Sequence, residues 1–192
     1  NTTVARLDIP TTSESASSIV ALPGDWDVIF RSQPCLPLKT GSKALEGHMA
    51  GGRLAFRPPS TLFLSSGDYH WDSTNHPVAL ADEMDNDYGK VIAIELDSGD
   101  TERYAYGFRN PQGIIIDAQG RLWTSEHGPR GGDELNLIHK GANYGWPRET
   151  LGTTPVKTPW PLTENYGRHD RSSQPIYAWL PSVGLSNLTQ ID

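Results

Sequence analysis

Short apolar runs separated by turn residues dominate the hydrophobic pattern of this chain. The runs are rich in β-branched and aromatic residues, and long patterns with a helical period are scarce. Nineteen glycines and fifteen prolines among 192 residues supply the turns, so we expect an all-β protein. The pattern predicts strands at Ser18 to Leu22, Asp27 to Arg31, Arg53 to Phe56, Leu62 to Ser65, Lys90 to Leu96, Ile114 to Ile116, Arg121 to Ser125, Glu134 to Ile138 and Pro175 to Trp179.

Two segments of the chain repeat one pattern. Each has an apolar triplet, a turn, a second run that ends in Ser, and then a Gly. The second runs begin at Leu62 and at Leu122, 60 positions later. A weaker third copy runs from Pro181 to Ile191. Repetition of this kind is typical of propeller blades, although a small self-contained β domain would also fit. The acidic stretch 69–89 accounts for the long spacing and is expected to be a surface insert.

Composition excludes several classes of partner. The net charge is −7 and the Lys and Arg residues are scattered, which disfavours nucleic acid and anionic membranes. No apolar run is long enough to span a bilayer. The first residues lack the features of a signal peptide, but a secreted protein from which the signal peptide has been removed would lack them too. Cys35 is the single cysteine, so an intrachain disulfide is not possible.

Polar clusters stand at the ends of two predicted strands. The stretch 109–113 precedes the run at Ile114, and the stretch 126–129 follows the run that begins at Leu122. Binding groups are often found where loops meet a rigid sheet. His48 lies in a glycine-rich segment and has the chemistry of a general base, although such a histidine is also common on a protein surface.

The order of these clusters carries a family resemblance. The chain resembles the soluble quinoprotein glucose/sorbosone dehydrogenases, which are six-bladed β-propellers that oxidise aldoses with pyrroloquinoline quinone (PQQ) and calcium. The match runs from about His48 to Leu188. It implies that residues 1–192 form a partial β-propeller domain of about three blades, with 69–89 as an insert. The matching motifs are Arg-Asn-Pro-Gln-Gly at 109–113, Ser-Glu-His-Gly-Pro at 125–129, Asp-Glu-Leu-Asn-Leu-Ile at 133–138 and Asn-Tyr-Gly-Trp-Pro at 143–147.

The resemblance implies three catalytic groups. His48 corresponds to the family's base in His-x-x-Gly-Arg, although this chain is one residue longer between His48 and Arg53. Asp68 corresponds to the aspartate that orients this base; without the family, it would equally be a turn aspartate bonded to its own backbone. Arg109 would stabilise negative charge on the cofactor; otherwise it would pair with an acid near a strand end.

Cofactor and metal ligands are implied in the same way. His48, Arg109 and Asn110 would face PQQ and the sugar. The carbonyls of Gly128 and Pro129 would hold the calcium that contacts the quinone, because calcium accepts backbone oxygens readily. Glu134 and the Tyr144 carbonyl match a second, structural calcium site, although Glu134 would equally suit a strand position facing solvent.

Other clusters of polar or aromatic residues have simpler interpretations. Asp82, Glu83, Asp85 and Asp87 lack the helices and distal glutamate of an EF-hand, which favours a solvated loop. Asp68, His70, Asp72 and His76 have irregular spacing for a transition-metal site. Trp146, Trp160 and Trp179 suit either sugar stacking or packing between blades.

The implied function is transfer of a hydride from the anomeric carbon of an aldose to PQQ, with an external electron acceptor and a periplasmic or secreted location. A non-enzymatic extracellular propeller that binds partners without the quinone is the alternative, and the longer His48 segment favours it. A purely structural β module needs only the strand pattern. Because the predicted strands are too few to close a propeller, we also expect the chain to associate with further blades or with itself.

Overall fold

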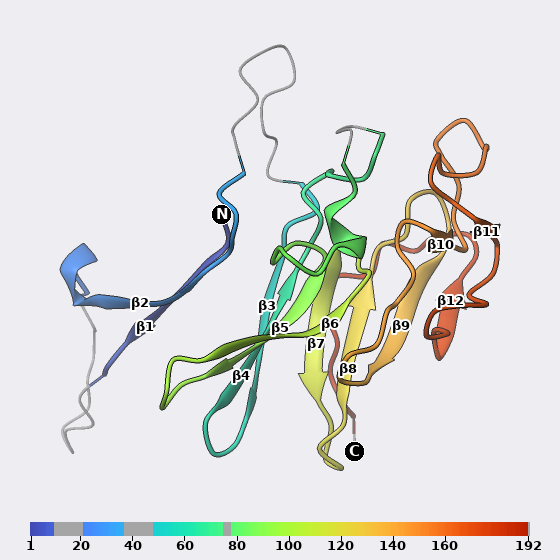
Figure 1. The fold of residues 1–192 in the computed structure, drawn as a ribbon. Coiled ribbons are helices and arrows are strands. Elements are labelled where there is room, and N and C mark those ends of the chain that lie inside the picture. Colours follow the sequence, from blue (N-terminus) through green and yellow to red (C-terminus); the bar gives the residue numbers. More distant parts are fainter. Residues whose placement is uncertain (10–20, 37–47, 75–77, 192) are drawn as a thin grey trace.

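Strands account for nearly all the regular structure of this chain. The computed structural model describes residues 1–9, 21–36, 48–74 and 78–191. Within these ranges the helices are two single 3-10 turns, η1 (Pro23–Asp25) and η2 (Leu80–Asp82). The strands form sheets that stand side by side, as Figure 1 shows. The predicted all-β class is confirmed.

The first of two four-stranded sheets is a simple meander. It consists of β3 (Gly51–Arg57), β4 (Thr61–Ser66), β5 (Lys90–Glu95) and β6 (Thr101–Tyr106), each antiparallel to the next. Its apolar side chains alternate between faces, as the two-residue period of a strand requires.

The second four-stranded sheet closes with a strand from later in the chain. Its order is β7 (Pro111–Ile116), β8 (Leu122–Glu126), β9 (Asp133–Ile138) and β12 (Tyr177–Trp179), all antiparallel. Between β9 and β12 the chain makes an excursion that contains the short parallel pair β10 (Glu149–Thr150) and β11 (Asn165–Tyr166). A separate antiparallel pair, β1 (Thr3–Leu7) and β2 (Trp26–Arg31), packs Val4 and Phe30 against the first four-stranded sheet.

The main core lies between the two four-stranded sheets. Phe63, Val91 and Ala105 from the first sheet pack with Ile114 and Leu122 from the second. The opposite face of the first sheet covers a second core with β1 and β2. Each sheet is therefore apolar on the faces that neighbouring sheets cover, which is the arrangement of blades in a propeller.

The first strands of the two sheets lie next to each other. Gly51 N donates to Asn110 Oδ1 at 3.2 Å, and Arg53 Nε donates to the Gln112 carbonyl at 3.3 Å. The two repeated segments thus occupy equivalent places, as the offset of sixty residues predicts. The third copy continues the series, because Gly113 of β7 lies against the backbone of Asn187 and Leu188.

Most predicted strands are present, with ends shifted by a few residues. Of the Ser18 to Leu22 prediction, residues 18–20 lie outside the described residues, and Ala21 and Leu22 are not in a strand. The Pro175 to Trp179 strand begins only at Tyr177. The sequence pattern did not predict β1, β6, β10 and β11. Strand β6 reads Thr-Glu-Arg-Tyr-Ala-Tyr and has no apolar run, and β10 and β11 have two residues each.

The prediction that 69–89 is a surface insert is only partly correct. Glu83 and Asp85 are exposed, but Asp72 and Asp87 are buried. The reason is the buried Lys90 ammonium, which donates to the carbonyls of Leu80, Ala81 and Tyr88 at 3.0, 3.0 and 2.6 Å and holds the segment against the sheet. The four-acid loop at 82–87 is therefore not a wholly solvated one.

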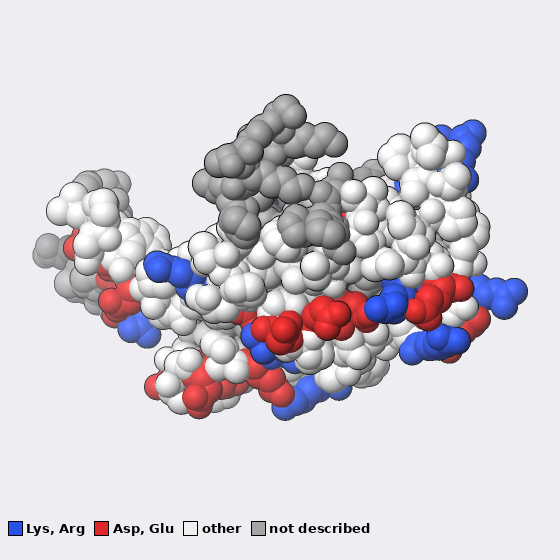
Figure 2. Space-filling view, turned by 45° about the horizontal axis from the view of Figure 1, so that its top comes forward, with Lys and Arg blue, Asp and Glu red and all other residues white. Residues whose placement is uncertain are grey.

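Charge on the surface is mixed. Figure 2 shows a band of acidic side chains across one face, with Lys and Arg side chains interspersed along it. This face offers no continuous basic patch for nucleic acid. In the described part of the chain, no helix is long and apolar enough to cross a membrane.

Candidate functional site

The loops at one end of the two sheets cross each other closely. Asp68 follows β4, and its N–H donates to the Arg109 carbonyl at 2.9 Å. Arg109 precedes β7, and its N–H donates to Glu126 Oε2, at the end of β8, at 2.9 Å. Gly67, just before Asp68, permits a close approach of the segment before β3, because a Cβ there would lie 2.0 Å from the Met49 carbonyl oxygen. The crossing brings three polar side chains from separate strands to one place.

Asp68 is a buried carboxylate with defined donors. Its Oδ2 accepts from Trp146 Nε1 at 2.7 Å and its Oδ1 accepts from His70 N at 2.9 Å. Burial raises the pKa of Asp68 to about 7, with the Arg109 charge lowering it and the Asp72 charge raising it further. The bond from His70 N is the local backbone contact expected of a turn aspartate. Asp68 therefore makes this turn contact as well as the long-range bond to Trp146.

His48 lies at the exposed rim of this site. The centroid of its ring is 6.0 Å from that of His70, and His70 Nδ1 is 4.0 Å from the buried Asp72 carboxylate. His70, which sequence reasoning considered only for a metal site, is thus the imidazole that links the Asp68 segment to His48. Among the residues that the structure describes, no three His, Cys, Asp or Glu side chains are arranged to hold a metal ion.

The Arg109 side chain contacts both the Gly128 loop and Trp146. Its Nη1 donates to the Gly128 carbonyl at 2.8 Å and to the His127 carbonyl at 3.4 Å. Its guanidinium carbon lies 5.5 Å from the centre of the Trp146 ring, a cation–π contact. Burial lowers the pKa of Arg109, and nearby carboxylates, first Asp68, oppose this. Its Nε is buried and, within the described ranges, has no hydrogen-bond partner.

Asn110 joins the two sheets. It is buried, and its amide oxygen accepts from Gly51 N at the start of β3. A contact with a cofactor would therefore use the amide nitrogen.

The Gly128–Pro129 loop is tightly closed. A Cβ at Gly128 would meet the carbonyl oxygens of Gly131 and Gly132 at 2.3 Å, so only glycine fits. Gly128 N donates to Asp133 Oδ1 at 3.1 Å, and Asp133 Oδ2 accepts from Val183 N and Gly184 N. The loop that carries the proposed calcium carbonyls is anchored by one buried carboxylate.

Glu134 does not face solvent, and that alternative is excluded. It is buried beside Glu126, and Asn136 Nδ2 donates to both carboxylates at 3.3 Å. His169 Nε2 lies 3.2 Å from Glu134 Oε1. Burial raises the pKa of Glu126 well above its usual value, and the charge of Glu134 raises it further. Two buried carboxyl groups this close are both ionised only beside positive charge, and His169 and Arg109 are cationic groups next to them.

A cavity of about 10 Å³ lies next to these carboxyl groups. Glu126, Glu134, Glu149, Tyr144 and the Gly128 loop line it. Tyr144 is buried, and its hydroxyl donates to the Leu137 carbonyl at 2.6 Å. Sequence reasoning included Tyr144 and Glu134 but missed Glu126, Glu149, Asn136 and His169. Of these, Glu126 and Asn136 had a signal, because they lie in the Ser-Glu-His-Gly-Pro and Asp-Glu-Leu-Asn-Leu-Ile motifs, whereas Glu149 and His169 had none.

Two of the three tryptophans singled out from the sequence pack beneath the site. Trp146 and Trp160 have ring centroids 5.0 Å apart, and Trp160 Nε1 donates to the Asp72 carbonyl at 2.9 Å. Trp179 lies apart from them, against Tyr177 on β12.

Comparison with known proteins assigns the family. Residues 24–192 match the model of the glucose/sorbosone dehydrogenase family. Aldose sugar dehydrogenase YliI of Escherichia coli (strain K12) is 32% identical over 180 residues, which cover 85% of this chain and 44% of that protein. Quinoprotein glucose dehydrogenase B of Acinetobacter calcoaceticus is 31% identical over 134 residues, covering 57% of this chain and 28% of that protein.

Solved structures agree with this result. The crystal structure of the soluble aldose sugar dehydrogenase from Escherichia coli in the apo form has a TM-score of 0.69 at 32% identity, covering 85% of this chain and 47% of that one. A glucose dehydrogenase crystal structure has a TM-score of 0.68 at 35% identity, covering 84% and 46%. The fold is therefore part of a β-propeller, and the chain spans less than half the length of these relatives. The chain belongs to the glucose/sorbosone dehydrogenase family.

Proposed function

We propose that this chain contributes part of the active site of a quinoprotein that oxidises aldoses at the anomeric carbon, with PQQ and calcium as cofactors. The observation that carries the proposal is the convergence of Asp68, Arg109 and the Gly128 carbonyl at one end of two adjacent sheets. The names of the Escherichia coli and Acinetobacter relatives supply the substrate class and the quinone. The substrate would be an aldose, electrons would pass to an external acceptor, and the location would be periplasmic or extracellular.

The donor groups fit calcium. Gly128 and Pro129 lie in a closed loop that Asp133 anchors, and their backbone carbonyl oxygens are of the type that calcium accepts. At the second site Glu126 and Glu134 are buried together, and Asn136 Oδ1 is a buried acceptor that finds no donor among the described residues. Calcium prefers such oxygen ligands. The carbonyls of Gly128 and Pro129 would hold one calcium, and Glu134 with the Tyr144 carbonyl would hold the other.

The donor groups also fit an anionic quinone. The buried Arg109 Nε lacks a partner within the described residues, and the adjacent Asn110 amide nitrogen offers a second donor. PQQ would supply the acceptor for the two electrons that leave with the anomeric hydride. The side chain of Arg109 would stabilise the negative charge that develops as those electrons arrive.

The chain's own residues would move the proton. A ring nitrogen of His48 would accept the proton of the anomeric hydroxyl while the hydride leaves the carbon, so that the aldose becomes a lactone. Asp68 would orient the base. Its two oxygens accept bonds from Trp146 and His70 N, and His70 is the neighbour of His48, so the orienting effect would act through this cluster.

The test uses the whole protein, reconstituted with PQQ and calcium and assayed on a panel of aldoses with an artificial electron acceptor. We expect His48→Ala to lower kcat by about 10² to 10⁴ with a smaller effect on KM, because a general base acts on the proton only as it leaves. His139→Ala is the matched control, since His139 is exposed just after β9, at the end opposite Asp133.

The non-enzymatic propeller remains the second candidate because of the extra residue in the His48 segment and the exposed position of His48. Wild-type rates in the His48→Ala protein would exclude His48 as the base. Absence of activity in the reconstituted wild-type protein would favour the binding module.

A further inference from the structure

One indole ring contacts two residues of the proposed site at once. Trp146 Nε1 donates to Asp68 Oδ2 at 2.7 Å, across 78 positions of sequence, and the face of the same ring lies 5.5 Å from the Arg109 guanidinium carbon. Trp146 and Asp68 are 4% and 1% exposed, so water does not compete for the hydrogen bond between them. Neither contact is needed for simple packing between blades, which is the role that tryptophan most often has in such a fold.

The position of the ring is itself well defined. Trp146 N donates to the Gly107 carbonyl at 3.0 Å, which fixes the backbone of Trp146 close to Arg109. Trp160 packs on the ring, and Ala81 belongs to the same buried cluster. The indole is thus held between the segment that follows β4 and the loop that precedes β7.

The indole N–H donates to a carboxylate whose charged form is destabilised by burial. The charged and titratable groups that face Asp68 are Arg109 from the β6–β7 connection and His70 and Asp72 from its own connection, with His48 beyond His70. Burial and the Asp72 charge favour the protonated carboxyl, whereas Arg109 and the donors His70 N and Trp146 Nε1 favour the carboxylate. Only the Trp146 contact comes from a side chain that a conservative replacement can remove without changing charge.

We propose that Trp146 is a positioning residue of the site: its N–H holds the Asp68 carboxylate, and its ring face holds the Arg109 guanidinium, so that the two groups keep a fixed relation to each other. The inference rests on the proposed function, because Asp68 and Arg109 matter to the reaction only if the site is a dehydrogenase site. It adds a residue whose chemical role is separate from proton or hydride transfer.

The experiment compares Trp146→Phe with the wild type in the reconstituted whole protein. Phenylalanine keeps a ring face for Arg109 but has no N–H for Asp68. We expect the acidic limb of the kcat/KM profile to move to higher pH by about one to two pH units, since a hydrogen bond to a charged group is lost. At high pH the variant should regain most of its activity. A uniform loss of activity with an unmoved limb would overturn the proposal.

The chain contains a matched control. Trp123 Nε1 donates to Asp117 Oδ2 at 2.8 Å, and Arg121 lies 5.3 Å from the Trp123 ring, at the β7–β8 turn. Trp123→Phe removes the same kind of bond far from the site and should leave the pH profile unchanged. A shift of equal size in Trp123→Phe would show that the Trp146 effect is general and would overturn the proposal.

A second measurement does not depend on activity. A double-mutant cycle of Trp146→Phe and Asp68→Asn, followed by denaturant unfolding at pH 8, measures the coupling between the two side chains. We expect a coupling that falls when the cycle is repeated at a pH where Asp68 is protonated, because the N–H then bonds to a neutral acceptor. An inactive wild-type protein with intact coupling would contradict the proposed function, whereas an active wild type without coupling would contradict the role of Trp146.

Discussion

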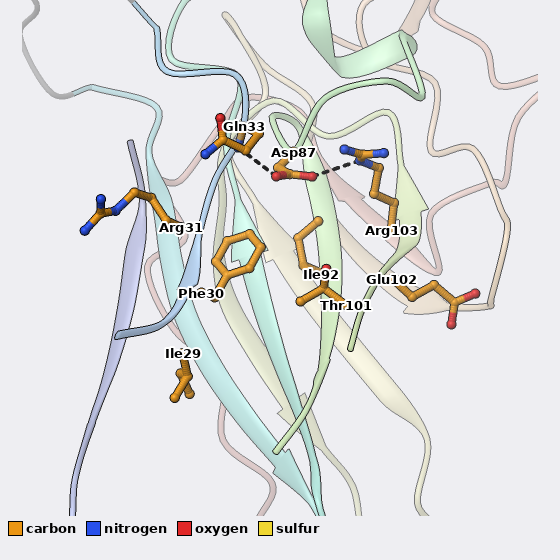
Figure 3. Close-up of a pocket in the computed structure, with 9 residues that line it drawn as sticks. All are labelled: Ile29, Phe30, Arg31, Gln33, Asp87, Ile92, Thr101, Glu102 and Arg103. Atoms are coloured by element: carbon orange, nitrogen blue, oxygen red, sulfur yellow. Dashed lines mark hydrogen bonds and ion pairs between the residues drawn. The ribbon is translucent and has the colours of Figure 1, made fainter. Parts of the chain in front are cut away.

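Arg109 Nη1 donates a hydrogen bond of 2.8 Å to the carbonyl oxygen of Gly128, nineteen residues further along the chain. The bond joins the loop before β7 to the loop after β8, and Asp133 holds the N–H of the same glycine. Charged side chains therefore hold Gly128 at both its N–H and its carbonyl oxygen. Figure 3 shows a comparable device elsewhere, where Asp87 accepts from Gln33 N and Arg103 Nε beside a pocket between β2 and β6.

The first prediction concerns Arg109. In the reconstituted whole protein, Arg109→Lys should reduce kcat/KM by about 10- to 100-fold, because an ammonium group cannot keep a planar contact with Trp146 and also donate to Gly128. We expect both kcat and KM to change, since Arg109 is proposed to contact cofactor and sugar. Arg121→Lys, at the remote β7–β8 turn, is the control. Unchanged kinetics in Arg109→Lys would place Arg109 outside the reaction.

The second prediction concerns the Glu126–Glu134 pair. Calcium in large excess over its Kd should stabilise the wild-type protein by about 2–3 kcal/mol for each bound ion through mass action, and Glu134→Gln should abolish the part of this gain that comes from the Glu134 site. Thermal unfolding with and without calcium, together with calorimetry, provides the measurement. Glu95→Gln is a suitable control, because Glu95 accepts bonds from Ser60 and Thr61 at the β4–β5 end of the sheet. Equal calcium effects in both variants would refute this site.

The third prediction concerns Asp133. Asp133→Ala should lower the free energy of unfolding by about 2–4 kcal/mol, because three backbone N–H groups lose their acceptor. Hydrogen exchange should accelerate at Gly128, Val183 and Gly184, which are the three donors. Asp117→Ala also removes an acceptor of backbone N–H groups, but at the β7–β8 turn, and should leave those amides unaffected. Exchange rates that stay at wild-type values in Asp133→Ala would count against the anchoring role.

The fourth prediction concerns the pH dependence of stability. Burial raises the pKa of Asp68 from 3.8 to about 7. Between these values the folded chain binds more protons than the unfolded chain, so the free energy of unfolding falls as pH rises. Asp68→Asn does not titrate, so wild-type stability relative to this variant should decline from about pH 4 to about pH 7 and then level off. Denaturant titrations across this range test it, with Asp97→Asn, in the exposed β5–β6 turn, as control. A rising difference would reverse the sign and contradict the burial argument.

The local pattern of the sequence was sufficient for much of the architecture. The strands with dense apolar character, such as Leu62 to Ser65 and Lys90 to Leu96, lie where the pattern predicts them, since a short continuous apolar run bounded by turn residues is typical of a strand buried on both faces. The repeat of sixty residues also predicted equivalent positions for β3 and β7. The motifs around Arg109 and Gly128 indicated two loops that the structure brings into contact at one end of the sheets.

The tertiary structure alone decided how the side chains of the site meet. The Trp146–Asp68 bond spans 78 positions, and no local signal indicates it. The sequence pattern places Glu134 in a strand but does not show which face of the sheet it lies on. Its burial beside Glu126 follows from the register of β8 with β9, which pairs these two residues. The segment 69–89 is acidic by composition, yet Lys90 draws part of it into the interior. Short-range patterns in the sequence predict where strands form and which of their side chains are buried. The contacts of a polar side chain depend instead on which distant segment the folded chain places against it.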